Sequence, residues 1–547
     1  MRALLVLLLV LFALPAMAQQ ETPEEERSMF LGFVEDRLSG PNRQIRIQGI
    51  EGVLSSNARI GSITVADNEG VWLRITDATI VWSRSALIFS QRLQIDRLAA
   101  ARIEVLRRPL PDESLPTPEA TPFRLPELPI AINLDALEVP SVSFGQDVFG
   151  LESELSVAGR IRLEGGSLDT ALDITRLDGP GGRFALTAAY ANQTEQLDLD
   201  LQLSEPENGV IANLLGIEGR PPVDLAVQGS GPLSGLDIEL ALDAAGERVL
   251  TGTTALRRQA EGLAYDARFA GPIARLVPVQ FRDFFGEDTA LTANGLVRDA
   301  GGVILDALAL ESAALSLAAS GETGTDGFLR RLHLDATLDN GTDERVVLPV
   351  PGGATTVQRA GLTLSFGETA SGEWSGLLTA DELSTADLAA REVRLTLGGV
   401  ASDLEQADRR SITFAADGAV SGIVAARADW NEALGDEIVL DIDGAWRAGG
   451  PVRLANAVVS GNGLSASLSG DIAEFAFNGD IAVEAASIAP FSGLAGRPVQ
   501  GALDLKARGT LEPVSGGFDL VIDSATQDLA IGIDAADRLL AGRSEER

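Results

Sequence analysis

Apolar and polar residues alternate one by one along much of this chain. Residues 196–204 read QLDLDLQLS, so four leucines fall on one side and Asp198, Asp200 and Gln202 on the other. Successive side chains leave opposite faces of a β-strand, so this period of two predicts a strand with one apolar and one hydrated face. The same pattern recurs at residues 168–174, 184–190, 223–227 and 236–242. We therefore predict an all-β protein built as a long ribbon of strands.

The N-terminal 40 residues differ from this pattern. Residues 1–18 place Arg2 before an apolar run and end in Ala16-Met17-Ala18, which is typical of a secretory signal peptide. The alternative is a retained anchor in the inner membrane, although the run is shorter than the roughly 20 residues of a spanning helix. Residues 19–40 are predicted to form an amphipathic helix that ends at Gly40-Pro41.

Three further segments follow. Residues 41–108 are predicted to be an N-terminal β unit, with a hairpin turn at residues 67–70. Residues 109–129 carry seven prolines and are predicted to be a stiff connector. Residues 130–547 are predicted to be a repetitive β region interrupted by short helices at residues 209–216 and 272–285, with a turn at residues 229–235. At roughly 11 residues per strand and turn, this region would supply on the order of 35 to 40 strands.

Composition removes several function classes. The chain has 43 basic and 79 acidic residues and a net charge of −36, which argues against nucleic acid as a partner. It has no cysteine and a single histidine, His333, in an alternating strand where a solvated or packed imidazole is expected. No phosphate-binding loop, nucleophile elbow or metal-binding motif is present. We therefore predict a non-enzyme that uses no cofactor and no metal.

The apolar side of the ribbon needs a cover. Open sheets of more than about ten strands curl, split or close, because each strand is twisted against the next. One outcome is a closed solenoid with a dry core, and the other is an elongated curled groove whose apolar lining is covered by lipid. Irregular turns and variable strand lengths favour the groove. The positions expected to line it are Leu172, Ile174, Leu186, Leu197, Leu199, Leu201, Leu203, Leu225, Leu236, Ile238, Leu240 and Leu242.

Several short motifs carry a family resemblance. They are Gly70-Val71-Trp72, Ile80-Val81-Trp82, Ser85-Ala86-Leu87, Arg107-Arg108-Pro109, FRLPELP at residues 123–129, RLDG at residues 176–179, LSEP at residues 203–206, LLG at residues 214–216, RPP at residues 220–222 and GSGPL at residues 229–233. With these motifs the chain resembles the N-terminal part of the TamB family, within the AsmA-like superfamily.

The resemblance implies a curled, lipid-lined β groove in the periplasm of a Gram-negative bacterium, associated with the inner membrane through its N-terminus. It implies phospholipids and a TamA-like outer-membrane barrel as partners, with roles in lipid transport and in outer-membrane protein assembly. Three hypotheses therefore stand: a lipid-conducting groove, a scaffold for outer-membrane protein or autotransporter assembly through an exposed sheet edge, and a closed structural solenoid.

Overall fold

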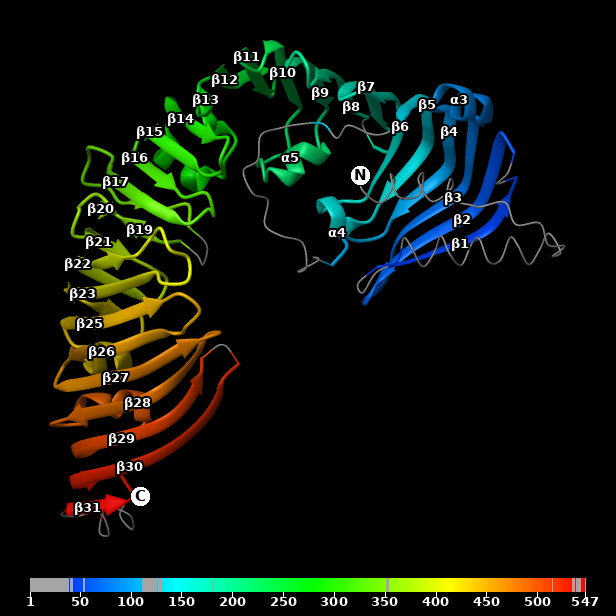
Figure 1. Ribbon diagram of the computed structural model, residues 1–547. Helices are drawn as coiled ribbons and strands as arrows, with labels where there is room; N and C mark the ends of the chain where they lie inside the picture. The colour runs from blue at the N-terminus through cyan, green and yellow to red at the C-terminus, as the bar shows by residue number, and fades with distance from the viewer. Residues whose placement is uncertain are drawn as a thin grey trace. The chain divides into compact units, whose positions relative to one another are not determined.

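The computed structural model describes residues 39, 43–52, 55–110, 125, 130–179, 181–350, 354–513, 515–533, 537 and 543–546. The chain divides into two compact units. The first comprises Met1–Gly271 and Arg275–Pro278, and the second comprises Pro272–Ala274 and Val279–Arg547. Each unit is a strand-rich sheet with a few short helices (Figure 1). This confirms the predicted all-β class.

The first unit contains thirteen strands and three short helices in the described residues. The strands are β1 (Gln44–Glu51), β2 (Asn57–Asp67), β3 (Gly70–Ser83), β4 (Arg92–Val105), β5 (Ala131–Phe144), β6 (Ser153–Glu164), β7 (Ser167–Arg176), β8 (Arg183–Ala191), β9 (Gln196–Glu205), β10 (Val223–Pro232), β11 (Gly235–Ala244), β12 (Glu247–Arg258) and β13 (Gly262–Gly271). The helices are α3 (Arg84–Ser90), α4 (Gln146–Phe149) and α5 (Val210–Leu214). Each strand pairs with the next in chain order.

One pairing in this sheet is parallel. β4 and β5 run in the same direction, with Arg92 opposite Ala131 and Val105 opposite Phe144, whereas all the other pairs are antiparallel. Parallel neighbours need a crossover of a dozen or more residues. The proline-rich segment between the two strands supplies that length. Residues 41–108 are therefore continuous with the sheet that follows, and the division between compact units lies near residue 271 instead.

The second unit contains eighteen strands in the described residues. They are β14 (Thr289–Arg298), β15 (Val303–Glu311), β16 (Leu315–Thr323), β17 (Leu329–Asp339), β18 (Val346–Val347), β19 (Thr356–Val357), β20 (Arg359–Phe366), β21 (Glu373–Ser384), β22 (Leu388–Ser402), β23 (Ser411–Ser421), β24 (Val424–Ala425), β25 (Glu437–Arg447), β26 (Val452–Gly461), β27 (Leu464–Ala473), β28 (Ala476–Ala485), β29 (Gln500–Glu512), β30 (Gly517–Ala530) and β31 (Arg543–Glu546). The α-helices are α6 (Arg282–Phe285), α7 (Ala428–Leu434) and α8 (Ser492–Ala495). Three 3-10 helices are η1 (Ile273–Arg275), η2 (Val279–Phe281) and η3 (Ala489–Phe491).

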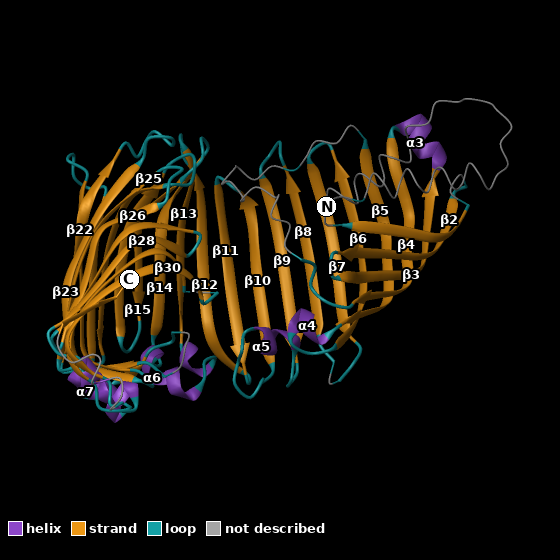
Figure 2. Cartoon of the chain, turned by 90° about the horizontal axis from the view of Figure 1, so that it is seen from below, coloured by secondary structure: helices purple, strands orange, loops and turns teal. Residues whose placement is uncertain are grey.

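The main sheet of the second unit is antiparallel, and its long strands pair in chain order. The two-residue strands β18, β19 and β24 are not part of this order. β17 pairs with β20 and β23 with β25, while β18 and β19 pair with each other and β24 pairs with β22. Figure 2 shows that the strands of this unit curl along their length, with α6 and α7 at one end of the strands. In the first unit, α4 and α5 lie at one end of the strands and α3 lies at the other.

Several local predictions are confirmed and others are corrected. The hairpin turn at residues 67–70 joins β2 to β3, and α5 occupies the predicted helix at residues 209–216. The segment at residues 272–285 is broken into η1, η2 and α6 rather than one helix. The predicted turn at residues 229–235 is wrong, because β10 continues to Pro232 and only Leu233 and Ser234 turn. Strands of 9 to 15 residues are common, so the described part of residues 130–547 holds β5 to β31, fewer than the 35 to 40 expected.

Three predictions lie outside the described residues. These are the signal peptide or anchor at residues 1–18, the amphipathic helix at residues 19–40 apart from Ser39, and the stiff connector at residues 109–129 apart from Pro109, Leu110 and Leu125. Within the described part of the chain, no helix is both long enough and apolar enough to cross a bilayer.

Candidate functional site: an apolar strip on the first unit

Strand register brings the predicted lining residues together. The alignment of β6 to β12 places all twelve on one face, in rows that run across the strands. Two rows occupy the middle of the strands. The first contains Leu172, Leu186, Leu201, Val227 and Leu240, and the second contains Thr170, Ala188, Leu199, Gly229 and Ile238. We call these two middle rows the apolar strip.

The apolar strip is not covered by a second protein layer of the described residues. None of its side chains is buried, because each is flanked by neighbours in the sheet but open above. Ile161 of β6, which extends the second row, is 36% exposed. The strands of this region make their main contacts with the two strands on either side of them. A half-buried apolar face that continues over several strands without a covering layer is unusual on a protein surface and marks a binding site.

Helix α5 closes one margin of the strip. Glu205 at the end of β9 is buried, and its carboxylate accepts hydrogen bonds from the backbone N–H groups of Val210 (3.1 Å) and Ile211 (2.7 Å). These bonds satisfy donors that the first turn of a helix leaves free. The helix then presents Ala212, which is fully buried, to a cluster that also contains Leu203. This margin of the face is therefore sealed.

The same cluster continues along the ends of the neighbouring strands. It contains Ile217, Val223, Leu242, Ala244 and Val249, with Phe184 and Leu225 packed against them. Helix α4 supports α5 from the side, where the Asn213 side-chain amide donates to the carbonyl of Phe149 at 2.7 Å. The short helices thus hold each other against one end of the strands, as Figure 2 shows.

A single connector residue closes the opposite margin. Leu125 is buried against Leu163 and Tyr190, and its backbone is held by Asn192 in the turn after β8. The Leu125 N–H donates to Asn192 Oδ1 (2.9 Å), and Asn192 Nδ2 donates to the Leu125 carbonyl (2.8 Å). Leu233, in the turn after β10, packs on the same cluster. The open strip is therefore bounded on both sides.

Three of the twelve predicted lining residues are buried in these margins. Leu203 and Leu242 are 9% and 8% exposed next to α5, and Leu236 is fully buried at the opposite margin. They share the apolar face but contribute nothing to its open part. The other nine are half-buried.

The opposite face of the sheet is polar and ionic. Arg183 pairs with Asp173, Arg257 with Asp237, and the Ser230 hydroxyl bonds to Asp198. These pairs are solvent-exposed, so each is worth little, about 0 to 1 kcal/mol. The face is predominantly polar, with small alanines such as Ala185 and Ala226 between the charged residues.

The second unit also has a half-buried apolar face, and other elements pack against its ends. A half-buried row of Leu440, Val459, Ala466, Val483 and Leu505 crosses β25 to β29. Near β16 to β22, Phe284 of α6 and the β18–β19 hairpin bury the end of the apolar face. At the other end of the strands, the Phe328 ring stacks on Trp446 (6.1 Å between centroids), and the Arg410 guanidinium lies 4.2 Å from the centre of the Phe328 ring.

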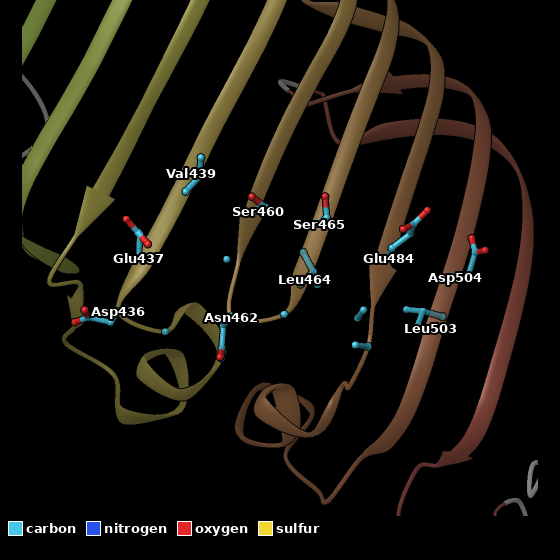
Figure 3. A pocket seen from close by; sticks show the side chains of 15 residues that line it. Asp436, Glu437, Val439, Ser460, Asn462, Leu464, Ser465, Glu484, Leu503 and Asp504 are labelled. Atoms are coloured by element: carbon cyan, nitrogen blue, oxygen red, sulfur yellow. The ribbon is translucent and has the colours of Figure 1, made fainter.

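A hollow of about 870 Å³ lies on the polar face of the second unit (Figure 3). Its walls carry Glu437, Ser460, Ser465, Glu484 and Asp504, whose side chains project from neighbouring strands. Four carboxylates, of Asp436, Glu437, Glu484 and Asp504, lie in this lining, so it does not suit an acyl chain. The described residues contain no group of side chains arranged to bind a metal ion.

Two further polar sites lie outside the strip. His333 of β17 is half-exposed and lies 3.8 Å from Glu368. At the β2–β3 turn, the Arg107 guanidinium hydrogen-bonds to the Asp67 carboxylate and holds its pKa well below the usual range, against the opposing effect of burial. Backbone N–H groups of Leu110 (3.0 Å) and Glu69 (2.9 Å) donate to the same carboxylate. This site stabilises the turn and takes no part in the strip.

The fold and the strip together define an all-β protein with an open apolar face bounded by protein on both sides. The chain matches no protein-family model, no curated protein and no solved structure. The strip is therefore the feature that bears on its function.

Proposed function

We propose that this protein is a groove of the TamB type that conducts phospholipids between the inner and outer membranes. The observation that carries the proposal is the apolar strip, whose rows run across the strands and stay open between two sealed margins. A closed solenoid would bury the middle rows as fully as the margins. The difference between Leu201, half-buried, and Leu236, fully buried, favours an open groove.

The dimensions of the strip suit acyl chains. Neighbouring strands are about 4.8 Å apart, so the four spacings from β7 to β11 make a strip of roughly 19 Å. Half the thickness of a bilayer core, about 15 Å, is the length available to the chains of one lipid. Burial of each CH₂ contributes about 0.8 kcal/mol, so a lined groove competes with a membrane for the chain. Because the first row of the strip is leucine and valine throughout, a chain that slides along this row meets similar contacts at each step.

Photo-crosslinking tests this proposal with matched positions. Crosslinkers at Leu199 and Leu240 face the strip, whereas crosslinkers at Asp198 and Glu239 occupy the adjacent positions on the polar face. We expect phospholipid to be captured at the first pair and not at the second, as read by mass spectrometry of the crosslinked protein. Equal capture at all four positions, or none at any, would reject a lipid-conducting strip.

The cellular setting of the proposal rests on the predicted signal segment and on the family resemblance. Both support a periplasmic protein associated with the inner membrane and active in outer-membrane biogenesis. Fractionation of Gram-negative cells that express the full chain tests the location. Recovery of the protein in the cytoplasm would contradict it.

One observation favours a second role as an assembly scaffold for outer-membrane proteins with a TamA-like barrel. Strand β31 pairs only with Ser524 to Gln527 of β30, and no described strand pairs with the preceding half of that edge. Phe518 and Val521 on this half are 76% and 65% exposed. An unpaired edge of this kind can accept a strand from another protein. Crosslinkers at Phe518 that capture a barrel protein would support the scaffold, and capture of lipid alone would not.

A further inference from the structure

An aromatic ring packs against a glycine on the apolar face of the first unit. Gly252 of β12 continues the first row of the strip beyond Leu240, and it stands opposite Phe269 of β13. A Cβ at position 252 would lie under 3.0 Å from two ring carbons of Phe269, closer than real Cβ atoms approach. The ring therefore occupies the space that a side chain at position 252 would need.

Gly252 is buried, whereas Phe269 is half-buried on the face that carries the strip. Phe269 thus belongs to the apolar face at the β12–β13 end of the first unit, in line with the first row of the strip.

The second unit contains the same pair independently. Phe414 of β23 lies opposite Gly444 of β25, and a Cβ at position 444 would again be under 3.0 Å from ring carbons of Phe414. Gly444 is buried and Phe414 is half-buried. The backbone carbonyl of Arg453 also lies under 3.0 Å from that Cβ, so substitution of Gly444 would disturb the sheet as well as the ring. Gly252 meets only side-chain atoms at such short distances, which makes it the cleaner site to test.

We infer that Gly252 is a positioning residue for lipid passage, because its missing side chain leaves room for the Phe269 ring at a point that a moving acyl chain must cross. This inference rests on the proposed function. With alanine at position 252, the new methyl group displaces the Phe269 ring from its place against residue 252. The ring then enters the open space above the strip. The obstruction acts on movement of the chain along the strip rather than on binding beside Leu201, which is three strands away.

A purely structural role makes a different prediction. Aromatic rings that cover glycines stabilise isolated sheets, so the pair could serve stability alone. In that case Gly252→Ala would shift the thermal unfolding midpoint but leave lipid movement unchanged. A transfer rate measured beside a stability measurement separates the two roles.

The test uses the full chain and two populations of vesicles made of phosphatidylethanolamine and phosphatidylglycerol. One population carries a fluorescent phosphatidylethanolamine, and its transfer to the other is followed over time. Gly252→Ala is expected to slow transfer by about tenfold or more, the factor produced by each 1.4 kcal/mol of added barrier. Gly235→Ala is the matched control, because a Cβ at position 235 meets nothing within 4 Å. Its transfer rate should equal that of the wild type.

Removal of the ring supplies the second variant. The double variant Gly252→Ala/Phe269→Ala should recover the wild-type rate, and Phe269→Ala alone should transfer lipid as fast as the wild type or faster. If Gly252→Ala fails to fold, a slow Phe269→Ala variant would by itself overturn the inference. A wild-type protein that transfers no lipid would overturn the proposed function and this role with it. Equal rates for Gly252→Ala and the wild type would overturn the role of the pair alone.

Discussion

The open middle of the apolar face predicts a large difference between two leucines that share it. Leu236 is fully buried at one margin, and Leu201 lies half-buried in the strip. Truncation of a buried leucine to alanine removes its transfer free energy and also leaves a cavity, for a total of about 3 kcal/mol or more. Truncation of Leu201 leaves no sealed cavity, because the space above it is already open. We therefore expect Leu201→Ala to destabilise the lipid-free protein by only about 1 kcal/mol.

Hydrogen exchange measures this difference locally, which matters because a chain of two units need not unfold in one step. Peptides from β9 to β12 are followed by mass spectrometry in lipid-free protein. A difference of about 2 kcal/mol between the variants corresponds to about thirtyfold in the opening equilibrium. Ile238→Ala serves as a second strip variant and should behave like Leu201→Ala. Losses of similar size for Leu236→Ala and Leu201→Ala would mean that a second layer covers the strip, and the groove would be refuted.

Three further predictions concern the margins and the first hairpin. Glu205→Ala removes the cap of α5, so the helix should exchange its amide hydrogens faster and the unit should lose about 1 to 2 kcal/mol; an unchanged helix would contradict the capping role. Asn192→Ala should release Leu125 and speed exchange of its amide, with no effect on α5. The Asp67 carboxylate accepts a hydrogen bond from Arg107, which lowers the pKa of Asp67. Its contribution to the stability of the folded protein is therefore complete above the ordinary aspartate pKa of 3.8 and is lost as the pH falls below that value. Asp67→Asn should remove that acid sensitivity in thermal unfolding scans between pH 5 and 2, and an unchanged pH profile would refute it.

The faces of the strands were predictable from local sequence. Alternation assigned Leu199 and Leu201 to one face and Asp198 and Asp200 to the other, and the register of β8 to β10 bears out that assignment. Each strand carries enough alternating positions that a slip by one residue would turn its leucines to water. The number of strands was overestimated because a strand and its connection together take more residues than the assumed spacing.

Burial along the apolar face was not predictable in the same way. Leu201 and Leu203 are two residues apart in one alternating run, yet only Leu203 is buried. The difference comes from α5, which follows in the chain, and at the other margin from Leu125, which precedes Asn192 by 67 residues. Such contacts between distant segments leave no periodic signal. Helices α3, α4, α7 and α8 were missed for a related reason, since four to seven residues are too few to show a helical period.

The Gly252–Phe269 pair had a partial signal in the sequence. Gly252 is an isolated glycine within β12, and such a glycine in a strand often marks a close approach of another group. The identity of that group depends on the register of the β12–β13 hairpin, which only the structure supplies.

The position of the one register shift in the β11–β12 pair is consistent with an uninterrupted apolar strip. From β6 to β13, the only shift occurs between Leu242 and Asp243 in the β11–β12 pair, at the margin sealed by α5. A bulge leaves one extra residue on a strand and changes which face the following residues point to. Placed in the middle rows, a bulge would interrupt the strip with polar side chains. Placed next to α5, it bends the strand while the rows through Leu201 and Leu199 stay continuous.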